Sequence, residues 1–180
     1  MRTTTTAQRP TGVERTFGPD EIIVTKTDPR GILTYANEVF LRTSALTEEE
    51  AIGQPHNIIR HPDMPRAVFK LLWETLGRRE EIFAYVVNMA ADGAHYWVYA
   101  HVTPSFSADG KLVGYHSNRR LPEPAVVAEV RRLYERIRTA EQQHTSKPAA
   151  VEAGWQALQS ELGGRTYDEF IWALTSGARW

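Results

Sequence analysis

The 180-residue sequence contains no cysteine, no excess of charge of either sign and no long hydrophobic run. Without cysteine the chain has no disulfide, no thiolate ligand for zinc or an iron–sulfur cluster, and no thiol for redox switching. Any redox sensing by this chain must therefore depend on a bound cofactor and not on a side-chain thiol.

Charge and hydropathy exclude further classes of protein. The formal net charge of -1 is not the basic excess that nucleic-acid-binding proteins show. No apolar run approaches the ~20 residues that a membrane helix needs, and the N-terminus lacks the apolar core of a signal peptide. We therefore expect a cytoplasmic protein without a membrane span or a nucleic-acid partner. The motifs of phosphate-binding loops, zinc proteases and serine hydrolases are also missing, so we expect no enzyme.

The order of the predicted elements indicates an α+β domain over residues 19–121, preceded by a flexible N-terminal arm over residues 1–18. Asp92-Gly93 and Asp109-Gly110 are hairpin turns between the last three strands. The order predicts one five-stranded antiparallel sheet with short helices on one face. The expected strands are 22–24, 32–35, 82–89, 95–103 and 112–119, and the expected helices are 37–44, 47–52 and 63–78.

The remaining residues are predicted to be helical. Apolar residues from Val126 to Ala140 recur at alternating spacings of four and three, which indicates an amphipathic helix within residues 122–145 that could transmit a signal. Lys147-Pro148 ends this pattern, and residues 146–180 form a helical tail to which the sequence assigns no chemistry. Packing on the sheet or at a dimer interface is the simplest role for that tail.

The segment Gly53–Pro65 is the most unusual part of the sequence. It places two histidines, an arginine and an aspartate between prolines, which fix φ and remove backbone donors. A stiff polar loop at the start of a helix suits an anionic ligand, because the first N–H groups of a helix are unpaired. We expect Asp63 to cap this helix, and an Arg60–Asp63 ion pair is the structural alternative to ligand binding.

Together these features resemble a PAS domain of the FAD-binding Aer aerotaxis-sensor family, over roughly residues 20–121. The resemblance implies an FAD held non-covalently between the concave face of the sheet and the short helices, without the cysteinyl adduct of blue-light sensors. The motifs that carry it are Tyr35-Ala36-Asn37, Gly53–Asn57, Arg60–Pro65, Asn88, Gly93, His95–Val98 and Gly114-Tyr115.

By position, the resemblance assigns FAD binding to the Arg-His-Pro-Asp loop and to residues near it. Arg60 could pair with a phosphate, and Trp73 offers an aromatic face. Asn37 could instead be only a turn-former, and Trp73 could simply pack in the core. The implied cofactor-binding residues are Asn37, His56, Asn57, Arg60, His61, Asp63 and Trp73.

Strand alternation adds two predictions about the sheet. On strand 95–103 the set Tyr96, Val98, Ala100 and Val102 should face the ligand. The set His95, Trp97, Tyr99 and His101 should form an outer aromatic face, covered by the C-terminal helices, a second protomer or a signalling partner.

On the last strand, Leu112, Gly114, His116 and Asn118 should face the ligand. His116 could couple flavin reduction to protonation, ligate haem iron, or be an ordinary core histidine. His61 is a weaker candidate for a haem ligand.

We interpret the sequence as a cytoplasmic PAS sensor whose FAD reports redox or oxygen status. His116 and Asn118 would pass the change through the last strand into helix 126–140. The signal would reach a separate output protein, or a homodimer formed through the outer sheet face and the C-terminal helices. The alternatives are a haem-binding gas sensor, a cofactor-free interaction module and, least favoured, a small flavin enzyme.

Overall fold

The computed structural model describes residues 9–176, and in this part of the chain five antiparallel strands form one sheet in the order β2-β1-β5-β4-β3. The predicted α+β architecture is confirmed. Asp92-Gly93 and Asp109-Gly110 lie in the two hairpin turns, with positive φ at both glycines. The strands are β1 (Ile23–Thr27), β2 (Leu33–Ala36), β3 (Ile82–Met89), β4 (His95–Phe106) and β5 (Leu112–Arg120).

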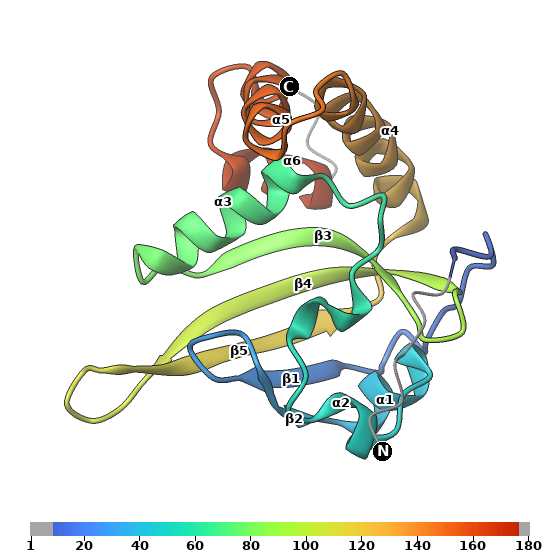
Figure 1. The fold of residues 1–180 in the computed structure, drawn as a ribbon, viewed down its shortest axis with the longest axis vertical. Coiled ribbons are helices and arrows are strands. Elements are labelled where there is room, and N and C mark those ends of the chain that lie inside the picture. Colours follow the sequence, from blue (N-terminus) through green and yellow to red (C-terminus); the bar gives the residue numbers. More distant parts are fainter. Residues whose placement is uncertain (1–8, 177–180) are drawn as a thin grey trace.

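Three short helical segments cover the concave face of the sheet on the β1–β2 side, and a longer helix lies beside β3 (Figure 1). Phe40 and Ile59 belong to the same buried cluster as Ile23 and Val98 of the sheet. Thr47 and the side chain of the glutamate three residues later form the predicted capping box. The helices are α1 (Glu38–Ser44), α2 (Glu48–Ala51), the 3-10 helix η1 (His56–Ile59) and α3 (Arg66–Gly77).

The C-terminal helices α4 (Pro124–Gln142), α5 (Lys147–Leu162) and α6 (Tyr167–Ser176) gather at the β3 end of the molecule, next to α3 (Figure 1). Trp97 of the outer face stacks on Tyr134 of α4 with ring centroids 6.1 Å apart. The Tyr134 hydroxyl donates to the Tyr85 carbonyl at 2.6 Å. Of the three covers that the sequence left open, the chain's own helices are the one observed.

Part of the segment before β1, which was expected to be a flexible arm, is hydrogen-bonded to the sheet. Residues 11–15 run along the start of β4, where Arg15 N donates to His95 O at 2.7 Å and His95 N donates to Val13 O at 2.9 Å. Phe17 is buried in the core. Residues 1–8 lie outside the described residues. None of the helices between residues 9 and 176 has the length and apolar character to span a membrane.

Candidate functional site

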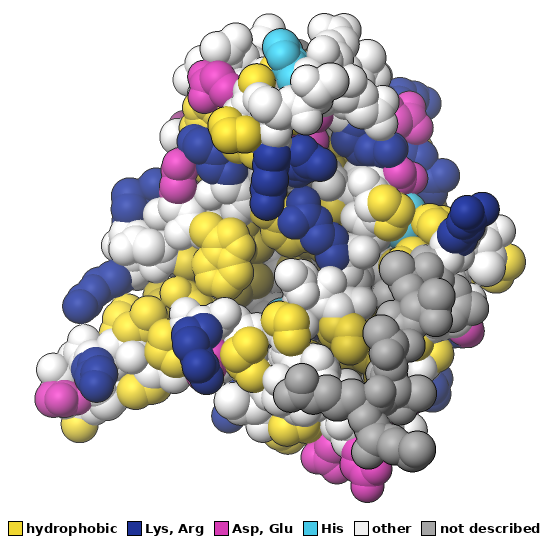
Figure 2. All heavy atoms as spheres, in the orientation of Figure 1, with side chains coloured by type: hydrophobic (Ala, Val, Ile, Leu, Met, Phe, Trp, Pro, Cys, Tyr) yellow, Lys and Arg dark blue, Asp and Glu magenta, His cyan; other side chains and the backbone are white. Residues whose placement is uncertain are grey.

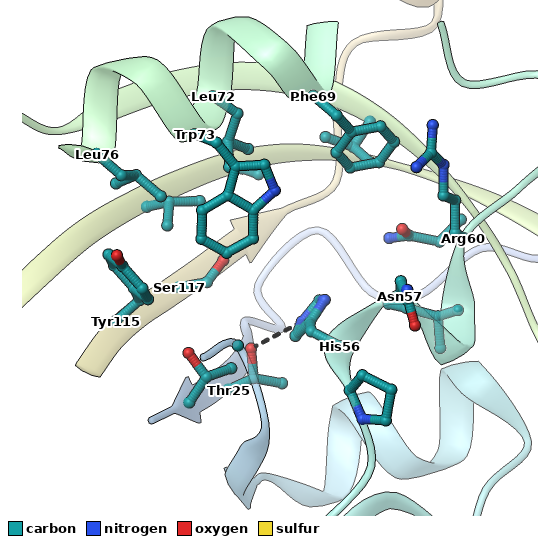
Figure 3. Close-up of a pocket in the computed structure, with 18 of the residues that line it drawn as sticks. Thr25, His56, Asn57, Arg60, Phe69, Leu72, Trp73, Leu76, Tyr115 and Ser117 are labelled. Carbon is teal, nitrogen blue, oxygen red and sulfur yellow. Dashed lines mark hydrogen bonds between the residues drawn. The ribbon is translucent and has the colours of Figure 1, made fainter. Parts of the chain in front are cut away.

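A cavity of about 240 Å³ lies between α3, η1, the β1–β2 turn and the concave face of the sheet. In Figure 3, Phe69, Leu72, Trp73 and Leu76 extend from α3 toward side chains of β1, β5 and η1 on the opposite wall. Figure 2 shows a hollow on this face, with hydrophobic side chains beside it and a group of Lys and Arg side chains above it. The cavity therefore has one apolar wall and one polar wall.

The polar wall contains buried atoms that have no hydrogen-bond partner among residues 9–176. They are Arg119 Nη1, Asn88 Nδ2, Ser117 Oγ and Thr27 Oγ1, and all four residues line the cavity. Buried polar groups are nearly always paired in folded proteins, because an unpaired group costs ~1–3 kcal/mol. These atoms indicate a ligand that supplies several hydrogen-bond acceptors.

Arg119 and His56 form the most buried polar contact of this wall. Arg119 is 4% exposed, and its Nη2 donates both to Thr25 Oγ1 at 2.8 Å and to His56 Nε2. A guanidinium can only donate, so His56 Nε2 must be the acceptor and the imidazole is neutral. Burial and then the nearby Arg119 charge lower the pKa of His56 to about 3, and burial lowers the pKa of Arg119 to about 10.

The cavity is positively charged. Among the described residues that line it are Arg30, Arg60 and Arg119, and none of those residues is an aspartate or a glutamate. The Arg60 guanidinium lies over the Phe69 ring, 4.0 Å from its centroid, and burial lowers its pKa. Arg30 pairs with Asp28 at 2.9 Å, whereas Arg60 and Arg119 have no ion pair among residues 9–176. An anionic or electron-rich ligand would supply their countercharge.

Four of the predicted cofactor-binding residues line this cavity: His56, Asn57, Arg60 and Trp73. Trp73 stands at the rim, 48% exposed, with its ring edge-on to Tyr115 at 5.6 Å between centroids. The indole also lies next to the β1–β2 turn, where a Cβ on Gly31 would be in van der Waals contact with it at 3.4 Å. Trp73 is therefore a wall of the cavity and not a core residue.

Three predicted residues lie elsewhere. Asn37 is the N-cap of α1; its Oδ1 accepts from Phe40 N and Val24 N, so it is the turn-former of the alternative interpretation. His61 and Asp63 line a second cavity beside α4, where Asp63 Oδ1 pairs with Arg138 Nη2 at 2.6 Å. Burial lowers the pKa of His61. Asp63 thus already has an ionic partner within the protein.

The prediction that His116 and Asn118 face the ligand is wrong. In the β4–β5 register, Ser117 is opposite Val102 and Arg119 is opposite Ala100, both on the cavity side. His116 and Asn118 alternate with them and share the outer face with His101 and its neighbours. Gly114 allows β5 to pack closely against β1, because a Cβ at this position would lie 1.9 Å from the Thr27 carbonyl oxygen.

Sequence reasoning missed Arg119, Ser117 and Thr25, and it used Asn88 only as a motif residue. The alternation of β4 was predicted correctly, since Ala100 and Val102 do line the cavity. Pairing the last strand against those two residues would have identified Ser117 and Arg119. The sequence contains no signal for that register, because β5 is polar on both faces.

The N-terminus of α3, expected to be open to an anion, is occupied by a side chain of α4. The N-cap position is Pro65, which provides no side-chain hydrogen bond, so Asp63 is not the cap. Instead the buried Glu141 accepts from Ala67 N at 2.9 Å through Oε1. The carboxylate therefore interacts favourably with the helix dipole from inside the protein, at the position where an external anion was expected.

Residues 33–119 match the family model described as the PAS fold, and this part of the chain is a PAS domain. Over 139 residues the chain is 38% identical to the aerotaxis receptor of Escherichia coli K12, covering 76% of this chain and 27% of that protein. It is 28% identical over 99 residues to the nitrogen fixation regulatory protein of Klebsiella pneumoniae, covering 55% and 20%. The aerotaxis-sensor type indicated by the sequence motifs is thus confirmed.

Solved structures show the same fold. The PAS domain of a protein from Colwellia psychrerythraea aligns with a TM-score of 0.51 at 19% identity, over 55% of this chain and 84% of that chain. The chain spans no more than 27% of the length of the two curated relatives, so their complete activities do not transfer with the fold.

Proposed function

We propose that this chain is a sensor that binds FAD non-covalently in the cavity beneath α3 and reports redox or oxygen status. The observation that carries the proposal is the set of unpartnered donors on one wall facing apolar side chains on the other. A flavin ring matches both walls, because one edge carries carbonyl oxygens and ring nitrogens and the other carries methyl groups. The resemblance to the aerotaxis-sensor family implies the same cofactor.

The cavity residues divide naturally between the parts of FAD. Asn88, Ser117 and Arg119 would hydrogen-bond the polar edge of the ring, and residues of α3 would pack on its faces. The volume of about 240 Å³ is below the ~300–1,000 Å³ of cavities that enclose a complete drug-sized ligand. The ring system would therefore fill the cavity, and the diphosphate would extend past the rim, within reach of Arg60.

A haem-binding sensor is the second cofactor hypothesis, and the cavity favours it less. Neither His61 nor His116, the histidines considered as iron ligands, lines the cavity. His56 does, but its Nε2 already accepts a hydrogen bond from Arg119. A cofactor-free interaction module would leave the four unpartnered polar atoms unexplained.

Bound FAD would supply electron-transfer chemistry, and its redox change would be passed to a partner protein. β5 carries Ser117 and Arg119 and leads directly into α4, so a shift at the cavity could alter how α4 packs. A separate output protein in the cytoplasm and a homodimer remain the proposed recipients. Since the C-terminal helices pack on the β3–β4 part of the outer face, self-association through that part would require these helices to move.

The absorption spectrum of the purified chain, with identification of any released pigment, tests the proposal. We expect a flavin spectrum and FAD. Arg60→Ala should weaken FAD binding roughly 10- to 100-fold, because it removes a charged partner of the diphosphate. Arg120→Ala is the matched control, since this exposed arginine of β5 points away from the cavity. A haem spectrum, or a colourless protein that takes up no added FAD, would contradict the proposal.

A further inference from the structure

The buried end of the cavity carries a positive charge that no acidic group among residues 9–176 neutralises. Arg119 is held by Thr25 and His56, and its Nη1 is buried without a partner among the described residues. The cost of burying an unpaired guanidinium is high, and it would be recovered if a bound ligand placed negative charge at that point. The arrangement indicates that the ligand is an anion in at least one of its states.

We propose that Arg119 stabilises the reduced flavin as an anion, so that two-electron reduction of the bound ring takes up one proton instead of two. The inference rests on the proposed FAD site and names the residue that determines the charge of the reduced ring there. A charged side chain near a flavin ring is one of the means by which proteins tune the electronic properties of the cofactor.

The groups around Arg119 give it a constant charge over the physiological pH range. Two ionisable side chains face it, His56 from η1 and Tyr96 from β4, while β1 and α1 present Thr25 and Phe40, which do not titrate. Burial raises the pKa of Tyr96 and lowers that of His56 to about 3, so both are neutral near pH 7. Near pH 7 the guanidinium of Arg119 is therefore the only charged group of these three side chains.

The reduction balances as follows. The oxidised ring accepts two electrons from a low-potential donor and one proton from solvent at N5, which gives a monoanion with its charge over N1 and the adjacent carbonyl oxygen. In water without a fixed cation, acidification adds a second proton at N1. A guanidinium beside this edge favours the anion and disfavours that second protonation.

Spectroelectrochemical titration of the full-length FAD complex with dithionite, from pH 5 to pH 8, tests the inference. One proton per two electrons changes the equilibrium constant tenfold per pH unit, which corresponds to a slope of about 30 mV per unit. We expect this slope for the wild-type chain throughout the range. Arg119→Gln should steepen it toward about 59 mV at the acid end, the value for two protons, and give the ultraviolet spectrum of the neutral reduced ring.

Two further variants separate the charge from the fold. Arg119→Lys keeps a cation and should keep the wild-type slope. Arg120→Gln removes the neighbouring charge on the opposite face of β5 and should change nothing. A wild-type complex that takes up two protons at pH 6, or an Arg119→Gln complex with the wild-type slope, would overturn the inference while leaving FAD binding intact. A chain that binds no FAD would overturn both proposals.

Discussion

His56 is a half-buried histidine held in its neutral form by the buried Arg119, and this contact loses stability in acid. The unfolded chain binds a proton on this imidazole below pH ~6.5, whereas in the folded chain its pKa is about 3. Stability changes with pH wherever the two states bind different numbers of protons. The contribution of His56 is complete above pH 6.5 and is lost progressively as the pH falls toward 3.

We expect this one residue to remove about 2 kcal/mol of folding free energy between pH 7 and pH 5, from a shift worth about 1.4 kcal/mol per unit. His56→Gln, which cannot be protonated, should lose less stability over the same interval. Urea unfolding at several pH values measures the difference. The exposed His144 provides the control, because His144→Gln should retain the wild-type pH dependence. An equal pH dependence in His56→Gln would contradict a neutral imidazole held by Arg119.

Three helices meet at a single carboxylate. Glu141 of α4 caps the N-terminus of α3, and Gly154 of α5 lies against the same side chain. A Cβ on Gly154 would lie 2.5 Å from Glu141 Oε1, which is closer than atoms can approach without movement. The arrangement connects the start of the cavity-lining helix to the C-terminal helices, since α3 carries Phe69, Leu72 and Trp73.

Glu141→Ala should therefore destabilise the fold by about 1–2 kcal/mol, the usual loss for a helix cap. Gly154→Ala should cost about 1–3 kcal/mol through overpacking. Because the methyl group collides with the glutamate, the double variant should be more stable than the sum of the two losses predicts, by at least ~0.5 kcal/mol. Urea unfolding measures all three. Glu152→Ala, at an exposed position on α5, is the control; additive losses would show that the contact is not formed.

The sheet and the C-terminal helices share one hydrophobic core. Tyr85 and Trp97 of the sheet belong to the same buried cluster as Leu133 and Ile137 of α4 and Leu158 of α5. The molecule should therefore unfold as one cooperative unit and not as a PAS domain with a detachable tail. Any signal that passes from the cavity to α4 must work against this shared packing.

Ile137→Ala should cost about 2–5 kcal/mol, because it creates a cavity at a residue with no exposed surface. Hydrogen exchange measured by mass spectrometry should then rise in α4 and in β3 and β4 together. Val113→Ala, at an exposed position of β5, should leave exchange in all three elements unchanged. Faster exchange confined to α4–α6 would indicate that the helices unfold independently of the sheet.

Local sequence patterns determined much of this protein. The turns at Asp92-Gly93 and Asp109-Gly110, the capping box at Thr47 and the alternation of β4 depend on neighbouring residues, so each was predictable. His56, Asn57, Arg60 and Trp73 were identified because they belong to a motif or to a helix next to it. The α+β class followed from the order of these elements, and the family resemblance followed from that order together with the motif residues.

Only the tertiary structure decided which distant groups meet. β5 is polar on both faces, so its alternation could not show whether His116 or Arg119 faces the cavity until its register with β4 was known. Glu141 caps α3 from 74 positions along the chain, a contact with no local signature. The segment at Val13 and Arg15 is held through backbone hydrogen bonds to β4, which the order of side chains along the sequence does not predict. The local order of polar and apolar residues determines local structure, whereas the charge and polarity of the cavity depend on long-range packing.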